Sequence, residues 1–134
     1  IMHHIIGRDP ANDSAVFGMG LNKDISLSPA ETPYIYTFTN SDYLVTRIRS
    51  AEGENYAYAV HYSDVSGATT PWKRLKEYVN LGDAFDAQGK WMYAVTTGAP
   101  HYRIVRIDMS TGELQDEFLP PQEDVIAGTD GSHN

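Results

Sequence analysis

The apolar residues of this chain fall in short runs rich in Tyr, Val, Ile and Thr, and clusters of Gly, Asn, Asp, Ser or Pro separate these runs. Aromatic and β-branched residues favour strands, and the separating residues favour tight turns. This pattern predicts an all-β fold. The expected strands lie near 1–6, 14–17, 33–39, 43–50, 55–62, 72–76, 82–87, 90–97, 102–108 and 114–119. The stretch from Lys73 to Val79 is the one place where a short helix is an alternative.

Neither face of the predicted strands is cleanly polar. In the strand near 90–97, the large Trp91 and Tyr93 alternate with the apolar Met92 and Ala94. Sheets that are covered on both faces give this pattern, and stacked propeller blades are a common way to cover both faces of an antiparallel sheet. A sandwich with one solvent-facing side per sheet would show more polar outer faces.

A repeat supports the same interpretation. The segments 34–75 and 83–119 share a plan of strand, tight turn, strand, loop, strand ending in a polar residue, turn and short fourth strand. Tyr43-Leu44-Val45 corresponds to Trp91-Met92-Tyr93. Tyr58-Ala59-Val60-His61 corresponds to Val105-Arg106-Ile107-Asp108, so that the offset is roughly 47 to 48 positions. A four-stranded unit at a period in the forties is typical of β-propellers.

We therefore predict antiparallel four-stranded blades of a β-propeller, about two of them complete and partial ones on either side. The predicted boundaries are the end of one blade in 1–20, a second blade in 28–78, a third blade in 79–121, and the start of the next blade or a tail in 122–134. The smallest closed propellers need about four blades, so sequence outside this chain is expected to complete the ring. Ile1 already lies in an alternating segment, which suggests that the polypeptide begins upstream. Unpaired strand edges and blade faces predict self-association of the isolated chain.

Composition excludes several classes of function. The formal net charge is -8, and binding to phosphates needs cations, so we expect neither nucleic acid nor a membrane as a partner. The absence of cysteine excludes disulfides, thiolate metal sites and cysteine nucleophiles. The five histidines are scattered without the spacing of a metal site, so that neither a metal nor a cofactor is predicted. The compartment stays open, with the cytoplasm favoured over the periplasm.

Two stretches carry a family resemblance. The run Ala99 to Asp108, preceded by Tyr93 to Thr97, resembles the T-x-x-x-A-P-x-Y-R-L-V-x-V-D stretch of prolyl oligopeptidase propellers. Ile1 to Gly7, followed by Asp13 to Phe17, resembles the V-Y-Y-H-x-L-G-T and D-x-L-V-F segments of that family. The likeness departs from the family at Arg8, where the family has Thr.

The landmarks between these stretches keep the order and spacing of the family. Asp42 to Val45 stands in the place of G-R-Y-L, and Trp72 to Leu75 stands in the place of the following W-x-x-L. The resemblance covers nearly the whole chain and ends at Gly128, after which no match is seen.

The resemblance implies a seven-bladed propeller that caps an α/β-hydrolase domain, and this domain cleaves short peptides after proline through a Ser, Asp and His triad. The implied partners are the peptidase domain of the same parent polypeptide and short peptide substrates. No serine of this chain lies in a Gly-x-Ser-x-Gly turn, so we predict no catalytic residue among residues 1–134.

Loops that join the second and third strands of each blade emerge on one rim of a propeller, and the resemblance implies that this rim faces the peptidase domain. Two loops of this chain are selected in that way. The candidate residues for the domain interface or for substrate contact are Ser50, Glu52, Gly53, Glu54, Asn55, Gly98, Pro100 and His101. They are expected to make contacts rather than to perform bond chemistry.

Two alternatives stay open. The aromatic residues Tyr56, Tyr58, Tyr62, Trp91 and Tyr93 could form a stacking platform for a sugar or for proline, although their period of two favours packing between blades. The whole chain could instead be a non-enzymatic binding module, a propeller or β-sandwich that holds a protein or a glycan, because propellers host many functions. A downstream hydrolase domain with a nucleophile elbow would decide for the peptidase.

Overall fold

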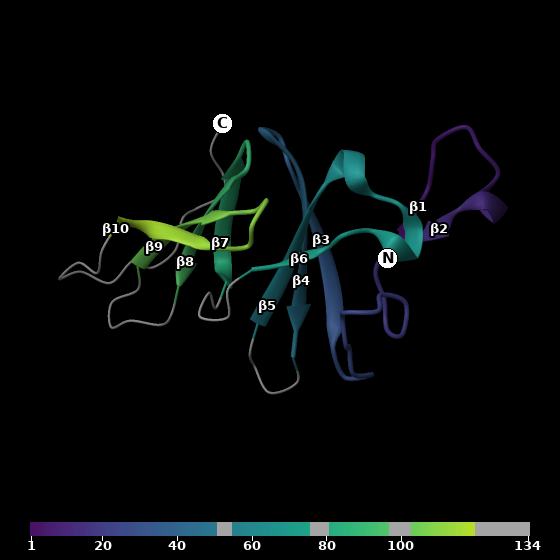
Figure 1. The fold of residues 1–134 in the computed structure, drawn as a ribbon, viewed down its shortest axis with the longest axis horizontal. Coiled ribbons are helices and arrows are strands. Elements are labelled where there is room, and N and C mark those ends of the chain that lie inside the picture. The colour runs from purple at the N-terminus through teal and green to yellow at the C-terminus, as the bar shows by residue number, and fades with distance from the viewer. Residues whose placement is uncertain (51–54, 76–80, 97–102, 120–134) are drawn as a thin grey trace.

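The computed structural model describes residues 1–50, 55–75, 81–96 and 103–119. These residues form one two-stranded and two four-stranded antiparallel sheets (Figure 1). In the described ranges the helical elements are short 3₁₀ turns, and none of them is long and apolar enough to cross a membrane. The prediction of an all-β antiparallel fold is therefore confirmed, while no sheet of the described residues closes on itself.

The chain begins with a small hairpin. β1 (Met2–His3) pairs with β2 (Ser14–Ala15), and the 3₁₀ turn η1 (Pro10–Asn12) lies in the connection. The side chain of Asp9 caps this turn by accepting a hydrogen bond from the backbone N–H of Ala11 at 2.9 Å. The paired part is much shorter than the expected strand 1–6, because the chain turns at residues 6–7.

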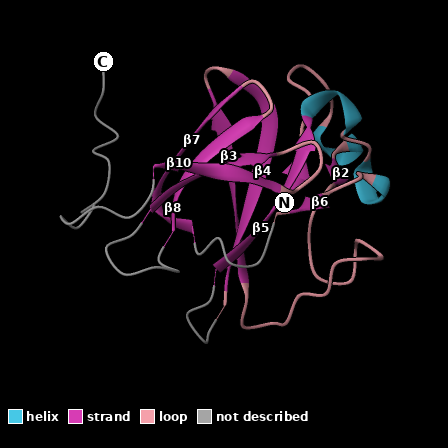
Figure 2. Cartoon of the chain, turned by 60° about the vertical axis from the view of Figure 1, so that its left-hand side comes forward, coloured by secondary structure: helices cyan, strands magenta, loops and turns pink. Residues whose placement is uncertain are grey.

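The first four-stranded sheet has the sequential order β3-β4-β5-β6. Its strands are β3 (Thr32–Phe38), β4 (Ser41–Arg49), β5 (Asn55–His61) and the very short β6 (Lys73–Arg74). The 3₁₀ turns η2 (Tyr62–Asp64) and η3 (Gly67–Thr69) connect β5 to β6. Figure 2 shows these turns on the side of the molecule where β2 and β6 lie. For the stretch from Lys73 to Val79 a strand and a short helix were both considered. Lys73 and Arg74 form a strand, and residues 76–80 lie outside the described part.

The second four-stranded sheet repeats this sequential order with β7-β8-β9-β10. Its strands are β7 (Leu81–Gln88), β8 (Trp91–Thr96), β9 (Arg103–Asp108) and β10 (Leu114–Leu119). Each agrees with a predicted range to within about one residue at either end, because short β-rich runs bounded by turn residues leave little choice of boundary.

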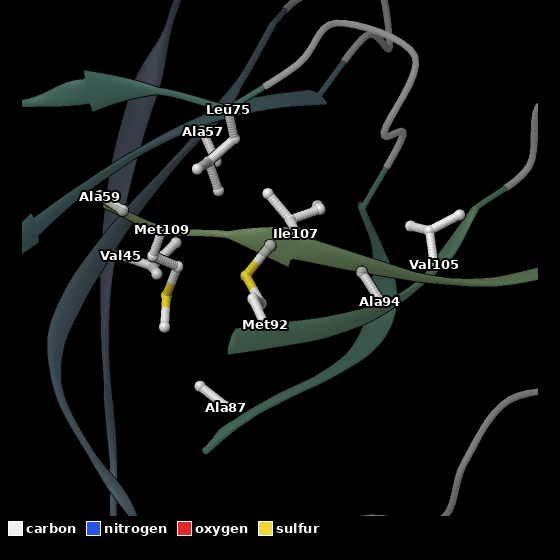
Figure 3. Packing of buried hydrophobic residues seen from close by; sticks show 10 residues of the cluster. All are labelled: Val45, Ala57, Ala59, Leu75, Ala87, Met92, Ala94, Val105, Ile107 and Met109. Atoms are coloured by element: carbon white, nitrogen blue, oxygen red, sulfur yellow. The ribbon is translucent and has the colours of Figure 1, made fainter. Parts of the chain in front are cut away.

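The main core lies between the two sheets. The first sheet presents small side chains, among them Ala57 and Ala59, and the second presents Met92 and Ile107, which are fully buried (Figure 3). Alanines on the packed faces let the backbones approach, and the flexible methionine fills the remaining gaps. The members of this core are Val45, Ala57, Ala59, Leu75, Ala87, Met92, Ala94, Val105, Ile107 and Met109.

A second core covers the opposite face of the first sheet. Phe17, Ile25 and Leu27 pack there against Ile48 and Tyr58. The ring of Phe17 lies 5.8 Å from the ring of Tyr58, centroid to centroid, in a tilted arrangement. The first sheet is therefore covered on both faces, as its alternation of apolar residues predicted.

The aromatic residues differ in how far they are buried. Tyr58 lies in the second core, as predicted, whereas Tyr62 is 57% exposed in the turn η2, so the expectation that it packs between blades was wrong. Trp91 is half-buried, and the cationic groups of Arg106 and Lys90 lie 4.4 and 4.8 Å from its ring centroid. These cations cover part of the ring that a neighbouring sheet was expected to cover.

The turn between β3 and β4 is hydrogen-bonded to the turn between β7 and β8, and these bonds connect the two sheets. The N–H of Gly89 donates to the carbonyl of Asn40 at 2.8 Å, and the hydroxyl of Ser41 donates to the carbonyl of Gly89 at 2.6 Å. In the turn between β9 and β10, Gly112 has a φ of 76° and lies so close to β6 that an added Cβ would stand 2.1 Å from the carbonyl oxygen of Arg74. No side chain fits at that position.

We predict that Gly112→Ala destabilises the protein far more than Gly89→Ala. Both glycines have a positive φ, so each alanine adds a backbone cost of about 1–2 kcal/mol, but nothing lies within 4 Å of a Cβ at Gly89. Only Gly112→Ala must also push the second sheet away from Arg74. Urea unfolding monitored by circular dichroism measures both; equal losses of stability in the two variants would contradict the close approach of Gly112.

Candidate functional site

The predicted loop residues are described only in part. Ser50 follows β4 and is half-buried, and Asn55 opens β5 as the ladder partner of Arg49. The structure thus brings Ser50 and the backbone of Asn55 to the same end of the first sheet. The other candidates lie outside the described residues, namely Glu52, Gly53, Glu54, Gly98, Pro100 and His101.

The described residues form a pocket at the opposite end, where β5 and β9 finish. It has a volume of about 240 Å³, and its lining comes from both four-stranded sheets. Ala59, Val60 and Met109 are its buried apolar residues. Its polar residues are the partly exposed Tyr43 and His61 together with the exposed Asp64, Lys73 and Ser110. No pattern in the sequence connects these residues, because they converge only when the two sheets pack.

His61 ends β5 and caps the turn η2. Its Nδ1 accepts a hydrogen bond from the backbone N–H of Ser63 at 3.2 Å and lies 2.7 Å from the hydroxyl of the same serine. Because Nδ1 is an acceptor, a neutral His61 carries its proton on Nε2. The Tyr43 and His61 rings meet in a T-shaped arrangement at a centroid distance of 5.1 Å. The imidazole is thereby fixed in orientation.

The contact between Ser63 and His61 is a cap rather than a catalytic dyad. The same nitrogen that would deprotonate the hydroxyl already accepts the N–H of Ser63, as a capping group does. Among the described residues, no carboxylate is hydrogen-bonded to His61 to orient it as a base. The arrangement therefore holds the strand end in place.

Asp108 plays the equivalent part at the end of β9. Its Oδ1 accepts hydrogen bonds from the backbone N–H of Ser110, at 2.9 Å, and from the hydroxyl of Ser110. The Lys90 ammonium lies 3.2 Å from Oδ2. Burial raises the pKa of Asp108, but the bonds from Ser110 and the Lys90 charge outweigh this effect, and the net pKa lies below the usual value. The spacing His61-x-Ser63 and Asp108-x-Ser110 is visible in the sequence at the repeat offset.

Tyr43 stays a neutral phenol at physiological pH. Burial raises its pKa, and the negative charges of Asp108 and Asp64 raise it further. The pocket thus offers a phenol, an imidazole of fixed orientation, one ammonium from Lys73 and one carboxylate from Asp64. Such a set can hold a small polar group by hydrogen bonds, and it supplies no activated nucleophile.

Among the described residues, no group of three His, Asp or Glu side chains is placed to hold a metal ion. His4 instead pairs with Asp13, with 2.6 Å between Nδ1 and Oδ1. The His3 and Tyr62 rings meet in a T-shaped arrangement with their centroids 6.2 Å apart, so the adjacent histidines contact different residues.

No protein-family model, no curated protein and no solved structure matches the chain.

We predict that Asp108→Asn lowers stability at neutral pH by about 1–3 kcal/mol, as expected when a buried charged acceptor is lost. The pKa of Asp108 is lower in the folded than in the unfolded state, so its stabilisation is present above the unfolded value of about 3.9 and is lost as the pH falls through the folded value. The variant should therefore lose less stability than the native protein between about pH 5 and 2. Urea midpoints across this range measure the effect, and Asp24→Asn, at an exposed carboxylate, is the control. Parallel pH profiles for the native protein and Asp108→Asn would refute the role of Asp108.

Proposed function

We propose that this chain contributes consecutive blades of a β-propeller, and that this propeller is the lid of a prolyl oligopeptidase-like serine peptidase. The observation that carries the proposal is the way in which the sheets follow one another. In Figure 1 the small hairpin, the first sheet and the second sheet succeed each other across the view, and each sheet is a simple meander.

The two sheets are equivalent residue by residue in their central ladders. Tyr43 pairs with His61 at the start of the β4–β5 ladder, and Trp91 pairs with Asp108 at the start of the β8–β9 ladder. His61 and Asp108 then cap the following turn in the same manner, through a serine two positions later. This equivalence supports a structural repeat with the offset found in the sequence.

The two four-stranded sheets stack with equivalent faces in the same direction. The second sheet packs on the first with the face that bears Met92 and Ala94. Their equivalents in the first sheet, one repeat earlier, are Leu44 and Thr46, which lie on the face of Ile48 that contacts Phe17. Equivalent faces thus point the same way. Stacking of this kind is heterologous and continues until a ring closes, as it does in propellers.

This stacking favours a propeller over a β-sandwich. Sandwich sheets share strands through Greek-key crossovers, whereas here each sheet is completed before the next begins. In a sandwich, furthermore, the outer face of the first sheet would meet water instead of a second core.

The lid function follows from the family resemblance together with the chemistry of the site. A propeller above an α/β-hydrolase domain admits short peptides and excludes folded proteins, and it encloses a triad where preorganised electrostatics act in a water-poor site. The capped strand ends of this chain are suited to holding a rigid scaffold, and the triad belongs to the peptidase domain of the parent polypeptide.

A non-enzymatic binding module for a protein or glycan is the second candidate. It is favoured by the pocket between the sheets, whose phenol, imidazole, ammonium and carboxylate could receive a polar group of a partner. Under this proposal no hydrolase domain accompanies the propeller.

The test uses the complete polypeptide that contains these residues. We expect it to cleave a proline-containing fluorogenic peptide and to react covalently with a fluorophosphonate, with the modified serine outside residues 1–134. The isolated chain of 134 residues should show neither property. A complete polypeptide that lacks both properties would contradict the peptidase function and favour the binding module, and a fluorophosphonate adduct on this chain would contradict its role as a lid.

A further inference from the structure

Three polar side chains of the pocket between the sheets come from one stretch of the chain, from the end of β5 to β6. β5 ends at His61, the turn η2 contributes Asp64, and β6 contributes Lys73. The second sheet contributes Met109 and Ser110, which directly follow β9. These polar groups are therefore held on one strand connection, and the turn of the next sheet lies opposite them.

The strand register directs Lys73 toward the pocket. Lys73 is the ladder partner of Ala59, and Arg74 is the ladder partner of Tyr58. Ladder partners that lie directly opposite each other share a face of the sheet. Ala59 belongs to the core between the two sheets, and Tyr58 belongs to the second core on the other face. Lys73 thus lies on the face of the pocket, and Arg74 lies on the opposite face.

Lys73 and Asp64 bring opposite charges to the pocket without neutralising each other. Both residues are exposed, and no salt bridge joins them in the described part of the chain. A ligand with a carboxylate and an ammonium group can pair with both charges at once, by hydrogen bonds that charge strengthens. The proton on Nε2 of neutral His61 is a further donor for a carboxylate, because Nδ1 is engaged by Ser63. This set of groups favours a zwitterion over a simple anion or cation.

The size of the pocket suits a small molecule. Its volume of about 240 Å³ corresponds to roughly eight water molecules at about 30 Å³ each. It is smaller than the roughly 300–1,000 Å³ that drug-sized ligands occupy. Ala59 and Met109, both fully buried, lie next to each other on its apolar side (Figure 3). A short aliphatic group is the part of a ligand that matches this surface.

We propose that the pocket binds a free α-amino acid with a short aliphatic side chain, such as valine. The carboxylate of the ligand pairs with the ammonium of Lys73 and accepts a hydrogen bond from Nε2 of His61. The ammonium of the ligand pairs with Asp64, and its side chain packs on Ala59 and Met109. Because the charged groups are exposed, the dissociation constant should be roughly 0.1–10 mM.

The site stays open in the ring of blades that we propose. β3, the first strand of its blade, faces the central channel of such a ring, whereas the pocket is built at β5 and β6. The pocket lies at the opposite end of the first sheet from Ser50 and Asn55, which the family resemblance places toward the peptidase domain. The inference rests on the packing of the two sheets and goes beyond the lid function, so it holds whether or not the parent is a peptidase.

Nuclear magnetic resonance titrations of the chain with three probes test the recognition of a zwitterion. The probes are L-valine, isobutylamine, which lacks the carboxylate, and isovalerate, which lacks the amino group. We expect L-valine to shift the amide signals of His61 and Ser110 in a saturable manner and to leave Asn55, at the other end of β5, unchanged. Both analogues should bind at least about tenfold more weakly. Equal affinities for the three probes, or no saturable shift with L-valine up to about 100 mM, would overturn the proposal.

Charge substitutions test which side chains bind the ligand. Lys73→Gln and Asp64→Asn each remove one charge from the pocket and should weaken the binding of L-valine by roughly tenfold or more. Arg74→Gln is the matched control, because it removes the same charge from the adjacent residue on the opposite face and should leave the affinity unchanged. Urea midpoints confirm that the three variants fold. Native affinity in Lys73→Gln or in Asp64→Asn, or an equal loss in Arg74→Gln, would overturn the proposal.

Discussion

Small side chains between the two four-stranded sheets determine how closely these sheets pack. Ala57, Ala59, Ala87 and Ala94 are almost completely buried there, and they let one backbone approach the other closely enough for the Met92 side chain to fill the space between them. The same approach brings the turn at Gly112 against the edge of β6. The pocket depends on the same packing, because its lining includes residues that follow β9 as well as residues of the first sheet.

The strand ends connect this packing to function. His61 and Asp108 close equivalent ends of equivalent strands, each through a serine two residues later, and both ends contribute to one inter-sheet region. These polar groups are engaged in holding turns, so their chemistry is structural. A rigid scaffold without an activated nucleophile is what a lid or a binding module needs, and the proposed peptidase function places bond cleavage elsewhere in the parent polypeptide.

The sequence was sufficient to predict the long strands β3 to β5 and β7 to β10, since β-rich runs bounded by turn residues determine them locally. It overestimated the lengths of β1, β2 and β6, whose paired parts have only two residues each. The equivalence of Tyr43 and Trp91 could also be predicted, because a structural repeat leaves a repeat in the sequence. Burial depends on which elements meet, so the exposure of Tyr62 and the cations beside Trp91 were not foreseen. The pocket could not be predicted, because its lining residues come from both sheets and are far apart in the sequence. Most of the predicted rim loops lie outside the described residues, so their part in the site stays a prediction.

Native-state hydrogen exchange of Met92→Ala tests the central claim that the two sheets depend on one shared core. Removing this buried side chain should lower stability by about 2–5 kcal/mol. Because the core is shared, the amides of Val45 in the first sheet and Val105 in the second should lose protection by the same free energy. Met19→Ala, at a residue that is 64% exposed, is the control and should leave both amides unchanged. Loss of protection at Val105 with Val45 unaffected would show that the sheets are stable independently and would contradict the account.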